Sequence, residues 1–411
     1  MGSLVKKNIG RQVMPLILLA SWVSFTSQES FAQTAPKVTI SAPSKSIVKA
    51  SDSVSYTVTY SGADAVTLKA SDIALDPVPA TGGPSASGVV VSGTGLANGI
   101  AIRTVTLSGF SGNGTLGFKI ASGSAKKGII SAPLISAPLK VAVDTAPPTF
   151  AIMPPAVTNV RSSSPAISFV VNYTGAANVS LSENTKNKVL LTSSGIGSSP
   201  GPSATVTVAG TGNTSRVITL SSFSGDGTLA LALDGATATD TAGNSAAASA
   251  AQAGISSLPV IVVDNTPPTI NVSGPSIADA RASSSVTYTV TYSGASLITL
   301  KASDITVNKT GDASASVAVS GTGTSTRTVT LSGFKGNGAI GISIASGTAS
   351  DLAGNLAAAP QSASGTFAVD TAAPLVSVSA PSLTNAKADS TVTYTVNYTG
   401  ATNITLAASD I

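Results

Sequence analysis

The chain of 411 residues contains no cysteine and no histidine, and only 10% of its residues are charged and 4% aromatic. Without these two residue types there is no Cys/His zinc site, no thiol nucleophile, no disulfide and no imidazole general base. This excludes most hydrolase triads, and we predict no catalytic residue. Because no disulfide can stabilise a small module, each folding unit has to bury its own core, which indicates units of about 100 residues.

The charges that are present are scattered along the sequence. Lys and Arg number 22 and Asp and Glu 18, a formal net charge of +4. No stretch interleaves several basic residues with aromatic side chains, the pattern typical of a groove that binds nucleic acid. We therefore expect no nucleic-acid partner.

Residues 1–32 have the three parts of a secretory signal peptide. A basic start precedes an apolar stretch at residues 13–25, and Ser30-Phe31-Ala32 forms a small-x-small cleavage site. The apolar stretch is shorter than the roughly 18 residues that a membrane helix needs, and no later segment is longer. The sequence therefore predicts a secreted or cell-surface protein with no transmembrane segment in the mature chain.

One phrase recurs four times. Residues 54–63 read VSYTVTYSGA, close copies stand at 286–295 and 392–401, and a weaker copy stands at 167–176. The tyrosines at positions 60, 173, 292 and 398 are 113, 119 and 106 residues apart, which is the length of a domain and not of a solenoid turn. The predicted segments are a signal peptide at 1–32, domains at 33–148, 149–268 and 269–374, and a truncated fourth domain at 375–411.

Inside each repeat, apolar and hydroxyl side chains alternate. The residues that we expect on one buried face of a strand are Val54, Tyr56, Val58 and Tyr60. A strand with one buried and one solvent-exposed face is typical of an antiparallel sheet. About seven short strands per repeat suit a two-sheet sandwich. In the third repeat the expected strands lie at residues 270–273, 286–292, 297–300, 315–319, 327–331, 340–344 and 365–369.

Two further phrases mark the joints between repeats. Each complete repeat closes with Val-Asp followed by proline, at Asp144, Asp264 and Asp370, and Asp-x-Ala-Gly-Asn precedes two of these joints, at 240–244 and 351–355. In these features the chain resembles the tandem bacterial Ig-like domains of large secreted adhesins and surface stalk proteins. The resemblance implies an all-β fold of tandem Ig-like antiparallel β-sandwich domains in an extended array, outside the cell, often rigidified by calcium at the joints.

The joint phrases supply candidate calcium ligands. Calcium takes six to eight oxygen ligands, so a joint Asp could share the ion with the Asp and Asn of the phrase upstream of it. The predicted ligands are Asp240, Asn244 and Asp264 at one joint and Asp351, Asn355 and Asp370 at the next. The alternative is turn chemistry, in which Asx side chains bond their own backbone and glycine supplies a positive φ. Asp144 has no such phrase upstream, so its joint is the poorest candidate.

The fourth repeat ends at Ile411, which corresponds to Ile305 of the third repeat. The third repeat continues beyond that position. Judged by the third repeat, it holds three of seven strands, and its buried face has no opposite sheet. We expect that the sequence is truncated here.

Two functions remain open. The first is a non-catalytic extracellular or cell-surface repeat protein, a scaffold of the adhesin or stalk type, with a host or cell-surface protein or glycan as partner. The alternative is an accessory or glycan-binding region of an exported polysaccharide-acting enzyme whose catalytic domain is absent from this chain. Apart from calcium at the joints, no cofactor is expected.

Overall fold

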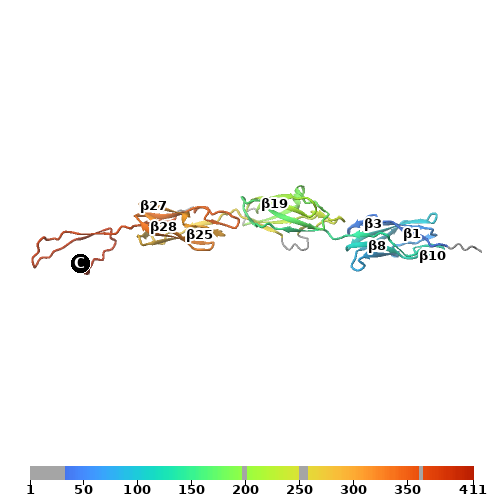
Figure 1. The fold of residues 1–411 in the computed structure, drawn as a ribbon, viewed down its shortest axis with the longest axis horizontal. Helices are drawn as coiled ribbons and strands as arrows, with labels where there is room; N and C mark the ends of the chain where they lie inside the picture. The colour runs from blue at the N-terminus through green and yellow to red at the C-terminus, as the bar shows by residue number, and fades with distance from the viewer. Residues whose placement is uncertain (1–32, 197–200, 250–257, 361–363) are drawn as a thin grey trace, which may run out of the picture. The chain divides into compact units, whose positions relative to one another are not determined.

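The computed structural model of the protein describes residues 33–196, 201–249, 258–360 and 364–411 (Figure 1). The predicted signal peptide at residues 1–32 lies outside these ranges. The chain separates into two compact units, Met1–Thr145 and Ala146–Ile411. Within the described residues, no helix has the length and apolar character that crossing a membrane requires.

The first unit contains a sandwich of two main sheets. One sheet has the order β1 (Lys37–Ile40), β3 (Ser53–Ser61), β7 (Ile100–Ser111) and β6 (Ser85–Ser92). The other has the order β11 (Ile135–Ser136), β8 (Gly114–Ile120), β12 (Val141–Val143) and β2 (Ile47–Val48), and β5 (Ile73–Val78) also pairs with β8. A small third sheet contains β10 (Ile130–Ser131), β9 (Ala125–Lys127) and β4 (Ala65–Val66).

The second unit begins with a sandwich of the same kind. Its first sheet has the order β13 (Thr149–Met153), β15 (Ile167–Thr174), β19 (Ser215–Ser224) and β18 (Ser203–Ala209). Its second sheet has the order β14 (Asn159–Val160), β22 (Val260–Val263), β20 (Gly227–Leu233) and β17 (Val189–Gly195). A small pair joins β16 (Asn178–Val179) to β21 (Ala238–Thr239).

The same unit then forms the sandwich once more. Its first sheet has the order β23 (Thr269–Val272), β25 (Ser285–Ser293), β29 (Thr326–Lys335) and β28 (Ser314–Ser320). Its second sheet has the order β24 (Asp279–Ala280), β32 (Phe367–Val369), β30 (Gly338–Ile344) and β27 (Ile305–Lys309), and β26 (Leu297–Ile298) pairs with β31 (Ala349–Ser350).

The strand order confirms the Ig-like fold. In the first repeat, β1, β3, β7 and β6 take the places of strands A, B, E and D of an immunoglobulin sandwich, and β5, β8 and β12 those of C, F and G. A short strand also pairs in parallel with the last strand of each complete repeat, β2 with β12, β14 with β22 and β24 with β32. Every other strand pair described is antiparallel, so the predicted all-β sandwich class is confirmed.

The alternating pattern of the repeated phrase is buried as predicted. In β3, Val54 is 1% exposed, and Tyr56, Val58 and Tyr60 are 0% exposed. These side chains join a core cluster that includes Leu116 and other residues of the opposite sheet. Each of the three core clusters lies within one repeat, from Val38 to Val143, from Phe150 to Val263 and from Ala280 to Val369. The exact segment boundaries stay predictions.

The seven strands expected in the third repeat are all present, but we missed the two-residue strands β24 and β31 and the longer strand β27. This strand follows a 3-10 turn, η4 (Ala302–Asp304), in which the Asp304 carboxylate accepts a hydrogen bond from the Lys301 amide at 3.0 Å. Only Ile305 of β27 is buried, and the strand pairs on one side only, with β30. An edge strand buries too few side chains to show a clear alternation in the sequence.

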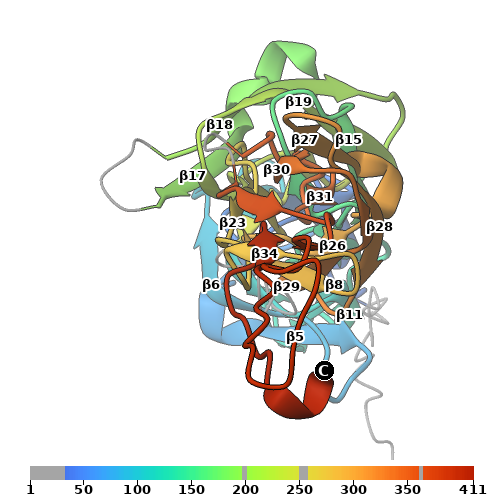
Figure 2. The same ribbon diagram turned by 90° about the vertical axis from the view of Figure 1, so that its left-hand side faces the viewer.

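Residues 375–411 form two paired strands, β33 (Leu375–Val378) and β34 (Val396–Thr399), and a 3-10 turn, η5 (Ala408–Asp410). Figures 1 and 2 show this segment in red, with open loops between the strands. We predicted three strands, and the structure describes two. No second sheet covers the apolar side chains among these described residues, and Val376 and Tyr394 are 57% and 58% exposed.

Candidate functional site

The Asp-x-Ala-Gly-Asn phrase of the third repeat folds into a tight loop after β31. The backbone amide of Asn355 donates to Asp351 Oδ1 at 2.9 Å, and Asn355 Nδ2 donates to Asp351 Oδ2 at 2.8 Å. Gly354 has a φ of +84°, a conformation that glycine adopts without strain. One carboxylate thus closes the loop by accepting two hydrogen bonds from the same asparagine.

The phrase of the second repeat forms the same loop. The backbone amide of Asn244 donates to Asp240 Oδ1 and its Nδ2 donates to Asp240 Oδ2, both at 2.8 Å. Gly243 has a φ of +82°. The recurrence shows that the phrase encodes a loop structure, which is the turn chemistry that we named as the alternative to calcium.

The loop of the third repeat also contacts the joint that ends the second repeat. Asn355 Nδ2 donates to the backbone carbonyl of Asp264 at 2.7 Å. Asn355 and Asp351 are only 7% and 9% exposed, which is low for polar side chains on a connecting loop. We call Asp264, Asp351 and Asn355 together the clasp.

Arg161 of the second repeat lies beside the clasp. A Cβ atom built on Gly354 would lie 3.9 Å from the Cζ and Nε atoms of Arg161, so the loop lies near the guanidinium with room for a Cβ atom between them. Arg161 was not among the residues predicted from the sequence. The signal was available, because an arginine followed three residues later by serine stands before a main strand of both the second and third repeats, at Arg161 and Arg281.

The structure groups the predicted site residues differently from the sequence prediction. We grouped Asn355 with Asp370, the joint downstream of it, and the structure brings it to Asp264, the joint upstream. The cause is strand direction, because β30 pairs antiparallel with β32 and starts at Gly338 opposite Val369. At about 3.3 Å per residue, β30 carries the chain roughly 20 Å away from Asp370 before the loop begins. The same antiparallel pairing, of Gly227 with Val263, separates the Asp240 loop from Asp264.

The clasp does not fit a calcium cage. Both carboxylate oxygens of Asp351 accept hydrogen bonds from Asn355, which presents its amide NH₂ group, a donor, to the Asp264 carbonyl. Asp264 Oδ1 accepts from the Thr266 amide at 2.9 Å, and Asp370 Oδ1 accepts from the Ala372 amide at 2.9 Å. Calcium needs six to eight oxygens, and across the described ranges no three Asp or Glu side chains gather at one place. Calcium binding therefore stays a prediction of the resemblance.

Comparison with known proteins gives structural neighbours only. No family model matches the chain, and no curated protein does. Among solved structures it is similar to the Escherichia coli adhesin FdeC, at 15% identity and a TM-score of 0.31, over 82% of this chain and 96% of that one. It is also similar to invasin, a bacterial integrin-binding protein, at 12% identity and a TM-score of 0.25, over 75% of this chain and 56% of that one.

A third neighbour is the surface layer protein SbsC, domains 4–9, at 12% identity and a TM-score of 0.21, over 84% of this chain and 48% of that chain. The neighbours are of the kind that the repeated phrases resemble. Alignments at these TM-scores do not by themselves establish a shared fold. The Ig-like assignment therefore depends on the strand order within each repeat.

Proposed function

We propose that this chain is a non-catalytic extracellular or cell-surface scaffold of the adhesin or stalk type, built from tandem Ig-like domains. The observation that carries the proposal is the clasp, which couples one domain to the next through a side chain held in place for that contact. A chain of separately folded sandwiches needs such coupling between domains to transmit force or to keep its two ends at a fixed distance. The alternating hydroxyl side chains on the outer faces suit a soluble surface exposed to water.

The partner that we propose is a protein or glycan of a host or cell surface. Most large aromatic side chains of the three complete repeats are buried in their cores. Few are therefore left on the surface to stack against a sugar ring. Recognition would then depend on the hydroxyl-rich strands and on the loops at the ends of the sandwiches, where binding residues are commonly found.

The test is surface labelling followed by a binding screen. Cells that express the chain with residues 1–32 are labelled with an antibody to the second domain, without permeabilisation, beside cells that express residues 33–411. We expect labelling of the first cells only. Purified chain is then screened for binding to host cells and to an array of glycans and polysaccharides. Labelling that requires permeabilised cells would contradict the surface role, and turnover of any arrayed polysaccharide would contradict the non-catalytic one.

A further inference from the structure

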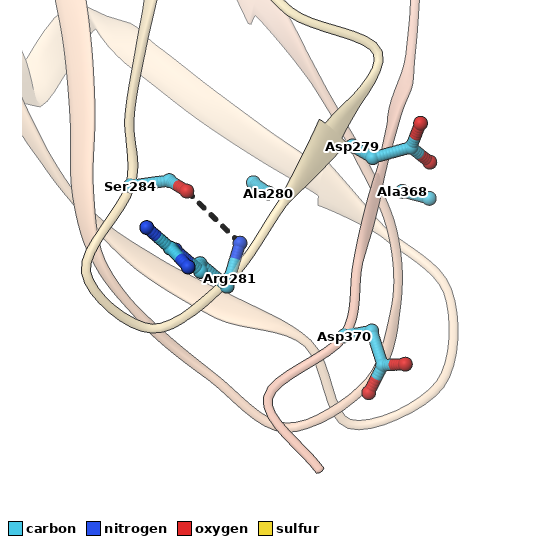
Figure 3. Close-up of a pocket in the computed structure, with 6 residues that line it drawn as sticks. All are labelled: Asp279, Ala280, Arg281, Ser284, Ala368 and Asp370. Carbon is cyan, nitrogen blue, oxygen red and sulfur yellow. Dashed lines mark hydrogen bonds between the residues drawn. The ribbon is translucent and has the colours of Figure 1, made fainter. Parts of the chain in front are cut away.

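The third repeat carries a small polar hollow at the end where the chain leaves it (Figure 3). Its volume is about 310 Å³. The residues that line it, which we call the third-domain hollow, are Asp279, Ala280, Arg281, Ser284, Ala368 and Asp370.

Backbone pairing and a local turn fix the shape of this hollow. Strand β24 runs parallel to β32, with Asp279 opposite Ala368, and the Asp370 amide donates to the Ala280 carbonyl at 3.0 Å. The Arg281 amide donates to Ser284 Oγ at 3.0 Å, which is the dashed line in Figure 3. The side chains on its rim are thus held on an ordered backbone.

The second repeat has the same backbone construction at the equivalent place. Strand β14 runs parallel to β22, with Asn159 opposite Val262, and the Asp264 amide donates to the Val160 carbonyl at 2.8 Å. The Arg161 amide donates to Ser164 Oγ at 3.0 Å, as Arg281 does to Ser284. Arg161 therefore corresponds to Arg281, and Asp264 corresponds to Asp370.

In the second repeat this place is covered by the clasp loop. Asn355 donates to the Asp264 carbonyl, and Gly354 lies near the Arg161 guanidinium. Arg161 and Asp264 are half-buried, whereas Arg281 and Asp370 are exposed. The two places share one backbone construction, and among the described residues a loop of the next repeat covers only the one in the second repeat.

We propose that the third-domain hollow is a docking site for an Asp-x-Ala-Gly-Asn loop of a further Ig-like domain. The asparagine of that loop donates its amide hydrogen to the Asp370 carbonyl, and the glycine lies near Arg281. The occupant is defined by its chemistry, a loop in which one Asp carboxylate holds the Asn side chain in a fixed orientation. This inference depends on the joint geometry and not on the proposed surface role.

The test exploits the absence of cysteine in the chain. A longer chain is made in which a second copy of residues 269–374 replaces residues 375–411, so that a complete domain with this loop follows the third-domain hollow. Ala282→Cys beside the hollow is combined with Leu352→Cys in the loop of the added copy, and a short bismaleimide is applied. The benchmark is Ser162→Cys with Leu352→Cys in the 411-residue chain, which places the same pair across the clasp. Hydrogen exchange of the added copy reports whether it is folded.

We expect the two pairs to cross-link at similar rates. Asn355→Ala in the added copy should slow its cross-linking by about fivefold, the factor that corresponds to one neutral hydrogen bond. A folded copy whose cross-linking is unchanged by Asn355→Ala overturns the proposal, as does a benchmark pair that fails to react. If the added copy does not fold, the same cysteines are placed in residues 1–411 extended by residues 306–374, which completes the fourth repeat, and the same two outcomes apply.

Discussion

Arg216 offers the sharpest test of how the second domain holds the segment around β16 against its first sheet. It lies in β19, is 5% exposed, and donates from Nε to the Leu181 carbonyl at 2.7 Å and from Nη2 to the Val179 carbonyl at 2.8 Å. A third bond runs from Nη1 to the neighbouring Ser215 carbonyl at 2.7 Å. The guanidinium thus ties the segment around β16 to the first sheet.

Arg216→Met keeps most of the apolar stem and removes the charged donors. Two of the lost hydrogen bonds are buried, and each hydrogen bond to a charged group contributes about 1.5–3 kcal/mol, so we expect a loss of about 3–6 kcal/mol in the free energy of unfolding of this domain. For a domain of this size that corresponds to a fall in melting temperature of roughly 15 °C or more. Differential scanning calorimetry measures the fall, and hydrogen exchange assigns the transition to the second domain.

The matched control is Arg327→Met in the third domain. Arg327 is half-buried and makes one long bond, of 3.3 Å, to the Ile298 carbonyl, while its other two bonds stay within its own hairpin. We expect about 1 kcal/mol for this change. Equal losses from the two variants, or a loss below about 1 kcal/mol for Arg216→Met, would refute the reasoning that buried bonds between segments dominate.

Three further predictions concern the cores and the joints. Tyr292→Phe removes the hydrogen bond between Tyr292 Oη and Thr348 Oγ1, which are 3.1 Å apart, and leaves the buried Thr348 hydroxyl unpaired. The free energy of unfolding of the third domain, measured by calorimetry, should fall by about 1–2 kcal/mol. An unchanged value would show that the bond is dispensable. Burial raises the pKa of Tyr60 and Tyr292, so their folded pKa lies above the unfolded value of about 10. Their contribution to stability is therefore complete below that pH and lost as the pH rises through the folded pKa, which melting curves and tyrosinate absorbance can follow; ionisation of all tyrosines near pH 10 with the fold intact would contradict it. Because the clasp is hydrogen-bonded, a chelator or added calcium should leave the melting temperatures of the second and third domains unchanged; a calcium-dependent rise would instead support the calcium binding that the resemblance predicts.

The parts of the fold that the sequence predicts are those that bury a regular face. Val54 and Tyr56 alternate with hydroxyl residues because one face of β3 is sealed against the opposite sheet, and the same rule located all seven strands expected in the third repeat. Strand β27 has one buried side chain and so carries no such pattern. The sequence therefore indicates the sandwich more clearly than its edges.

The three residues of the clasp are among the six that we predicted as calcium ligands, but the structure groups them differently. Asp351 and Asn355 stand out by their repeated spacing with glycine, and the structure brings them together. Their contact with Asp264 depends on the direction in which β30 crosses the domain, which the spacing between phrases does not encode. Arg161 was missed because its spacing to Ser164, which Arg281 and Ser284 repeat, stands outside the acidic phrases from which the site was predicted.

The most direct test of the central claim, that the clasp couples the second domain to the third, is a distance distribution between them. Spin labels are attached at Thr207→Cys in β18 and Ala318→Cys in β28, both of which are exposed. Distances between the labels are measured by pulsed electron paramagnetic resonance in the protein that carries only these two changes and in the protein that also carries Asn355→Ala. We predict a narrow distribution that broadens when Asn355 is replaced. Equally broad distributions in both proteins would contradict the claim.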